Sequence, residues 1–119
     1  MSAESFAVSI TTVEHFPWGK GCDGWRLLSQ PDLSVIQERV PAGAGEVPHF
    51  HHLARQFFYI LKGTGIVKFA ENSVRVEAGQ GIHAPPGVAH QFANPTAEAV
   101  EFLVISAPST SGDRVNLDA

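Results

Sequence analysis

The feature of this sequence that most limits its fold is the regular interruption of short apolar segments by glycine and proline. Segments 33–40 and 56–62 are typical, because they carry apolar and β-branched side chains and end at Pro41 and Gly63. Glycine and proline weaken helices and favour turns, and no stretch of about ten residues has helical periodicity. The pattern predicts an all-β fold of about ten short antiparallel strands, in a sandwich or barrel.

The expected strands follow one another along the whole chain. We predict a weak strand over 6–10, a loop over 15–23, and a polar tail over 109–119 that is frayed or laid on a neighbouring chain. The other expected strands cover 25–28, 33–40, 49–51, 56–62, 66–69, 74–77, 82–84, 90–93 and 100–105. On the last strand, either Phe102 and Val104 or Leu103 and Ile105 face inward.

Length and charge narrow the classes of protein. The 119 residues predict a single domain over 1–119. The net charge of −4 without a basic cluster argues against nucleic acid and anionic membranes as partners. The lone Cys22 and the absence of a signal-like N-terminus predict a cytoplasmic protein. The apolar share of 44% with only 17% charged residues predicts a partly covered surface, and we expect a homodimer.

Three of the six histidines lie within four positions, in the run Pro48-His49-Phe50-His51-His52. Successive side chains of a strand point to opposite faces, so His49 and His51 share a face whereas His52 points away. Two imidazoles on one face can bind one metal ion. We therefore expect His49 and His51 at a site and His52 outside it.

Two runs of the chain resemble the paired signature motifs of the cupin superfamily. The motifs read G-x5-H-x-H-x4-E-x6-G and G-x5-P-x-G-x2-H-x3-N, and they fall on residues 43–63 and 79–94. The matching residues are Gly43, His49, His51 and Gly63 in the first, and Gly79, Pro85, Gly87, His90 and Asn94 in the second.

This resemblance implies a double-stranded β-helix, a small jelly-roll barrel, that holds one divalent metal. By the motifs, His49, His51 and His90 are ligands, and Gln56 stands where the family has Glu. The amide oxygen of Gln56 can coordinate but carries no charge. Its neutrality predicts a site that favours an anion. The ligand set suits Zn, Fe, Ni or Mn.

Several functions fit such a site. The leading interpretation is a metal-binding cupin for a small, anionic or oxygenated metabolite, with oxygenase-type chemistry as one outcome. Glu38 is the candidate acid or base, and Arg39 or Arg75 are candidate anion-binding groups. The resemblance also extends to the uronate-linearising cupins, which combine three His with Gln, so a sugar or uronate isomerase is the second alternative. Here only Glu101 stands on the last strand in place of the catalytic Asp of those enzymes. A non-catalytic module for a small ligand is the third alternative, and His83 is interpreted as a hydrogen-bonded structural residue.

Overall fold

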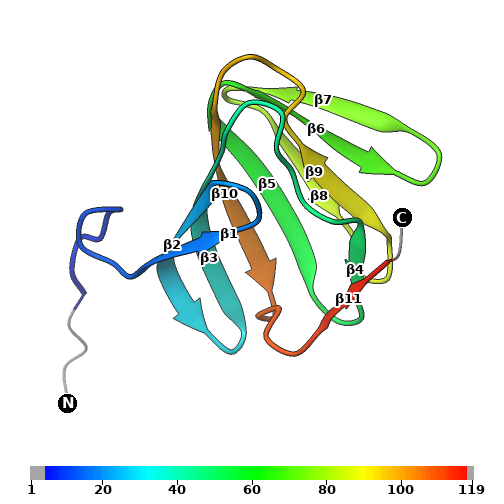
Figure 1. Cartoon of the computed structure of the whole chain (residues 1–119). Helices are drawn as coiled ribbons and strands as arrows, with labels where there is room; N and C mark the ends of the chain where they lie inside the picture. Colours follow the sequence, from blue (N-terminus) through cyan, green and yellow to red (C-terminus); the bar gives the residue numbers. More distant parts are fainter. Residues whose placement is uncertain (1–4, 118–119) are drawn as a thin grey trace.

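The computed structural model describes residues 5–117, which form eleven strands and no helix (Figure 1). In chain order the strands are β1 (His15–Trp18), β2 (Cys22–Gln30), β3 (Leu33–Val40), β4 (His49–His51), β5 (Arg55–Lys62), β6 (Thr64–Phe69), β7 (Ser73–Glu77), β8 (Gly81–Ala84), β9 (His90–Ala93), β10 (Val100–Ala107) and β11 (Arg114–Asn116).

The strands form two antiparallel sheets that face each other. The six-stranded sheet has the order β1-β2-β3-β10-β5-β8, and the five-stranded sheet has the order β11-β4-β9-β6-β7. The chain crosses repeatedly from one sheet to the other, as the colours of Figure 1 show. The all-β jelly-roll barrel expected from the sequence is confirmed.

The core fills the space between the sheets with three phenylalanine rings. Phe92 stacks on Phe102 with 4.1 Å between ring centroids, and Phe58 stacks on Phe92 at 5.8 Å. Every second residue of β5 is buried, which places Gln56, Phe58 and Ile60 on the inner face. Phe102 and Val104 are buried on β10, which decides the inner face that the sequence left open.

The N-terminal part differs from the sequence prediction. The loop expected over 15–23 is instead a hairpin of β1 and β2, turned by Gly19 and Gly21 at φ of 53° and 74°. Phe16 packs over Gly24, where an added Cβ would lie 2.3 Å from the ring. The strand expected over 6–10 is wrong, because no described strand lies beside it and Phe6 is 77% exposed.

The C-terminal tail also differs from the prediction. Residues 114–116 form β11, which pairs with β4 and places Arg114 opposite His51. The Asp113 carboxylate accepts hydrogen bonds from the backbone N–H groups of His52, Leu53 and Ala54, at 2.9 to 3.2 Å. These contacts hold the described part of the tail against the turn at residues 52–54, which follows His49 and His51.

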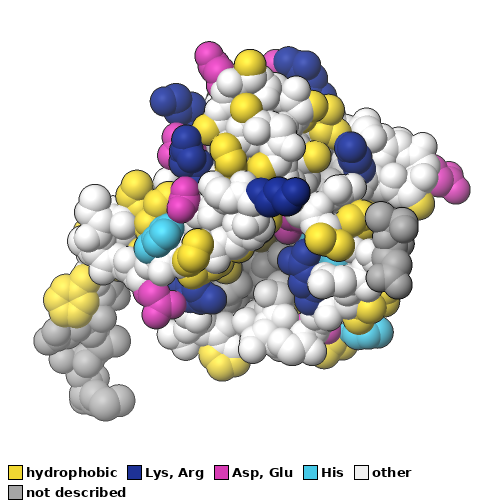
Figure 2. All heavy atoms as spheres, in the orientation of Figure 1, with side chains coloured by type: hydrophobic (Ala, Val, Ile, Leu, Met, Phe, Trp, Pro, Cys, Tyr) yellow, Lys and Arg dark blue, Asp and Glu magenta, His cyan; other side chains and the backbone are white. Residues whose placement is uncertain are grey.

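The surface in Figure 2 carries lysine, arginine and acidic side chains dispersed among one another. Over residues 5–117, the structure contains no helix that is long and apolar enough to cross a membrane.

Candidate metal centre

Three buried histidines converge inside the barrel. His49 and His51 lie on the inner face of β4, and His90 begins β9 directly opposite His49. One nitrogen from each ring lies within 4.8 Å of the others, so one metal ion could contact all three. His49 and His90, 41 residues apart in sequence, thus meet because β4 and β9 pair.

Backbone carbonyls orient two of these rings. The Nδ1–H of His49 donates to the Val47 carbonyl at 2.8 Å, and that of His90 donates to the Val88 carbonyl at 3.1 Å. Since a carbonyl only accepts, the proton of each neutral ring is on Nδ1 and its Nε2 keeps a free lone pair. This is the arrangement by which proteins direct imidazole Nε2 toward a metal.

His51 is the strongest indication that something binds here. Both of its ring nitrogens are buried and neither has a hydrogen-bond partner among the described residues. A buried polar group without a partner costs about 1–3 kcal/mol. A metal ion bound to one nitrogen would supply that partner, so the residues present fit the metal that the histidine pattern implies.

Gln56 lies beside the triad and is held by the last long strand. Its Nε2 donates to Ser106 Oγ at 3.1 Å, and its Oε1 lies 3.0 Å from His90 Nε2. Two acceptor atoms then face each other, because His90 Nε2 carries no proton. A shared cation would satisfy both atoms, as would an amide turned to donate to His90 while the Ser106 hydroxyl donates to Oε1.

Burial keeps the three rings neutral. It lowers the pKa of His49 to about 3 and also lowers the pKa of His51 and of His90. Metal ligation requires the neutral imidazole. The triad is therefore in its ligating form at neutral pH.

Two carboxyl groups and one arginine flank the triad. Glu46 Oε2 lies 3.9 Å from His49 Nε2 and 3.8 Å from Arg114 Nη1. Burial raises the pKa of Glu46 to about 7, although Arg114 and the Phe92 N–H act in the opposite direction. Burial raises the pKa of Glu38 well above its ordinary range, and the Glu46 carboxylate adds to that rise.

A cavity of about 260 Å³ opens beside these groups. Phe16 and Trp18 of β1 form an aromatic part of its lining, and Thr110 and Arg114 of the C-terminal segment also line it. The polar residues that line it are Arg26, Glu38, Glu46, His51, Gln56, Ser106, Thr110 and Arg114. The sequence-predicted Glu38 and Gln56 therefore share a cavity with His51.

Sequence reasoning missed Glu46 and Arg114. An acidic residue three positions before His49 was the available signal for Glu46. Arg114 gave no local signal, because β11 reaches the site only by pairing with β4. The segment that carries Phe16 and Trp18 was read as a loop.

Other predicted polar residues lie away from the cavity. His52 is exposed, as expected. His83 is exposed and hydrogen-bonded, with its Nε2 3.0 Å from Arg55 Nη1, which agrees with its interpretation as a hydrogen-bonded residue. The candidate anion-binding arginines do not line the cavity, since Arg39 lies 3.9 Å from Asp23 and Arg75 pairs with Glu77 at 3.5 Å.

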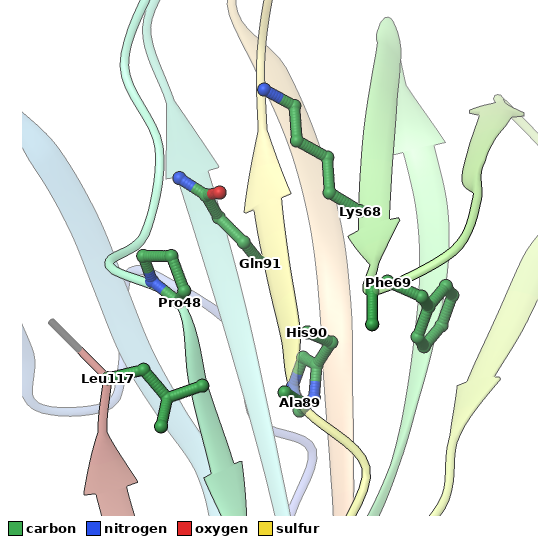
Figure 3. Close-up of a pocket in the computed structure, with 8 residues that line it drawn as sticks. Pro48, Lys68, Phe69, Ala89, His90, Gln91 and Leu117 are labelled. Atoms are coloured by element: carbon green, nitrogen blue, oxygen red, sulfur yellow. The ribbon is translucent and has the colours of Figure 1, made fainter. Parts of the chain in front are cut away.

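A second recess of about 280 Å³ lies where β6, β9 and the residue after β11 meet (Figure 3). Pro48 and Leu117 border it on one side and Phe69 on the other, with His90 between them. Of the triad, only His90 lines this recess. It is therefore separate from the cavity that contains the carboxyl groups.

Comparison with known proteins places this geometry among related folds. A curated relative, the uncharacterized protein MJ1618 of Methanocaldococcus jannaschii, is 28% identical over 78 residues, which cover 66% of this chain. The match spans 62% of the length of that relative.

Two solved structures share the fold over nearly the whole chain. The polyketide cyclase RemF from Streptomyces resistomycificus superposes with a TM-score of 0.82 at 20% identity, covering 98% of this chain and 87% of RemF. KdgF from Halomonas sp. superposes with a TM-score of 0.80 at 19% identity, covering 91% of this chain and 98% of KdgF. At these identities the likeness concerns the fold alone.

The sequence model of the Cupin domain family matches residues 36–106. That range includes β4, β5, β9 and most of β10, and with them all three histidines and Gln56. The chain belongs to the cupin family, with three histidines of its barrel placed so that they could hold a metal ion.

Proposed function

We propose that this protein is a metal-binding cupin that binds a small oxygenated metabolite in its barrel cavity. The observation that carries the proposal is the buried triad, in which neither ring nitrogen of His51 has a hydrogen-bond partner among residues 5–117. The same histidine lines the cavity of about 260 Å³. A metal held there is thus accessible to a bound molecule.

The proposed ligands are His49, His51 and His90, with the Gln56 amide oxygen as a fourth candidate. Zn, Fe, Ni and Mn all suit imidazole ligands in this number. Such a metal would act as a Lewis acid toward an oxygen atom of the bound molecule. Ser106 supports the arrangement by fixing the Gln56 side chain at 3.1 Å.

The cavity walls limit the class of molecule. Phe16 and Trp18 supply flat apolar surfaces, and Arg26 and Arg114 supply cationic donors for oxygen atoms. A volume of about 260 Å³ admits only a small molecule.

Glu38 is the proposed acid of a catalytic reaction. Burial raises its pKa and so favours the protonated carboxyl group, which can donate a proton to a bound oxygen. For the isomerase alternative Glu101 is not in position, because it lies on the outward face of β10, between the inward Val100 and Phe102, so that reaction would need one of the cavity carboxyl groups, Glu38 or Glu46.

Binding to a panel of small chelators tests the proposed function. Calorimetric titration with α-hydroxy acids, β-diketones and catechols should detect binding to metal-loaded protein and none after treatment with EDTA. Equal binding in both states, or no binding in either, would contradict the proposal. With a ligand in hand, Glu38→Gln separates the two remaining alternatives: an enzyme loses turnover while ligand affinity persists, whereas a binding module has no turnover to lose.

We also propose that the protein forms a homodimer. Phe57, Tyr59 and Leu61 expose 37–43% of their surface along the outer face of β5, and Phe6 and Val8 are exposed near the N-terminus. Such apolar side chains are suited to contact a second copy. Light scattering should give twice the chain mass of 12.8 kDa, and the mass of a single chain would refute the dimer.

A further inference from the structure

The segment before β4 holds Glu46 rigidly against β9. The Glu46 N–H donates to the Phe92 carbonyl at 2.8 Å, and the Gln91 side chain donates to the Glu46 carbonyl at 2.8 Å. The preceding Gly45 permits this approach, because a Cβ there would lie 2.7 Å from the Phe92 carbonyl oxygen. The backbone of Glu46 is thus held by hydrogen bonds to β9, the strand that begins with His90.

The two carboxylate oxygens of Glu46 have different neighbours. Its Oε1 accepts the Phe92 N–H at 3.1 Å, which fixes the direction of the carboxylate. Its Oε2 lies 3.9 Å from His49 Nε2, the nitrogen with the free lone pair. The side chain is only 11% exposed, and Arg114 Nη1, at 3.8 Å, is the cation beside Oε2.

Two acceptor atoms, Glu46 Oε2 and His49 Nε2, lie 3.9 Å apart, which leaves a position for a cation that both could contact. His49 Nε2 cannot donate, because the proton of that ring is on Nδ1 and bonded to Val47. Gln56 offers no charge to balance a divalent ion, whereas the Glu46 carboxylate lies on the His49 side of the triad.

We propose that Glu46 supplies the negative charge of the metal site, the role that Gln56 cannot fill, and that Arg114 competes with the metal for Glu46 Oε2. This inference rests on the proposed metal binding. It changes the expectation drawn from Gln56 alone, because a carboxylate beside the triad makes the site less selective for anions. Metal binding would also release the Arg114 guanidinium toward the cavity that it lines.

Metal affinity, measured without any turnover, tests the inference. Competition between the protein and a chromogenic chelator gives the Kd for Co²⁺, and the visible absorption of bound Co²⁺ reports its coordination. Glu46→Gln should weaken Co²⁺ binding at least about tenfold and change the spectrum, since loss of a group beside a metal typically costs 10–100-fold. Arg114→Gln should tighten binding, and Gln56→Glu should restore affinity to the Glu46→Gln variant.

Glu77→Gln is the matched control, because it removes the same kind of carboxylate from an arginine pair on β7, away from the triad. It should leave the Kd unchanged. If wild-type protein binds no Co²⁺, the proposed metal site itself fails and this inference fails with it. If wild-type protein binds Co²⁺ and Glu46→Gln binds it equally well, only this inference is overturned. Should Glu46→Gln not fold, an unaltered Kd in Arg114→Gln overturns it instead.

Discussion

The two halves of the barrel interior differ although the same strands build them. Along its inward face, β5 passes from Gln56 to Phe58, β9 passes from His90 to Phe92, and β10 passes from Ser106 to Phe102. One half is therefore stacked aromatic rings and the other is imidazole, amide and carboxyl groups. The aromatic half stabilises the fold, whereas the polar half lowers the stability of the metal-free chain and contains the candidate metal site.

The largest expected effect comes from the aromatic half. Phe102→Ala removes a fully buried ring that stacks on Phe92 at 4.1 Å. Unfolding in urea should show a loss of about 3–5 kcal/mol. The folded variant should still bind metal with the wild-type stoichiometry, because the three histidines are on other strands. Loss of metal from folded protein would show that the two halves are not independent.

Lowering the pH should reveal how far the buried histidines of the polar half reduce the free energy of unfolding. In the unfolded chain His49 takes up a proton near pH 6.5, but in the fold it does so only near pH 3. The unfolded state then binds more protons between these values, so the free energy of unfolding falls as pH falls. In EDTA, His49→Gln should lose about 3 kcal/mol less than wild type between pH 6.5 and pH 4.

The stability contribution of Glu46 changes with pH in the opposite direction to that of His49, so it must be considered in the same experiment. Its pKa is raised to about 7, so its contribution to stability is present below about pH 4.5 and is lost as pH rises through 7. This contribution is common to wild type and His49→Gln. Parallel pH profiles for the two proteins would contradict the assigned burial of His49.

Metal binding should increase the free energy of unfolding by satisfying the polar half. At a free metal concentration of 100 times Kd, unfolding of wild-type protein should require about 2.7 kcal/mol more than in EDTA. His90→Ala should show no such gain. Thermal unfolding with and without Zn²⁺ measures both, and an equal gain in the variant would exclude His90 as a ligand.

A smaller effect should show that His51 destabilises the metal-free protein and is needed for stabilisation by metal. Both ring nitrogens of His51 are buried without a hydrogen-bond partner in the described part of the chain, so His51→Leu should stabilise the metal-free protein by about 1–2 kcal/mol. The same variant should gain nothing from added metal. Urea unfolding in EDTA checks the first part, and a destabilised His51→Leu variant would show that the imidazole has a partner in solution.

Local patterns predicted the parts of this molecule that depend on neighbouring residues. The spacing of the two motifs brought His49, His51 and His90 together, as the structure has them. Turns at glycine and proline gave most strand positions to within two residues.

Long-range pairing accounts for what the sequence did not reveal. The segment with Trp18 looked like a loop because its strand character depends on pairing with β2. Arg114 reaches the site only because β11 pairs with β4, and Glu46 is placed by hydrogen bonds to Phe92, 46 residues away. No periodicity within either segment encodes these contacts.

The metal content of the purified protein tests the central claim most directly. Wild-type protein prepared without chelator, and His52→Ala as the control for an exposed histidine on the same turn, should each contain close to one divalent metal ion per chain by elemental analysis. His49→Ala, with the same circular dichroism spectrum, should contain almost none. Full metal occupancy in His49→Ala, or no metal in wild-type protein after incubation with Zn²⁺, Fe²⁺, Ni²⁺ and Mn²⁺, would contradict the account.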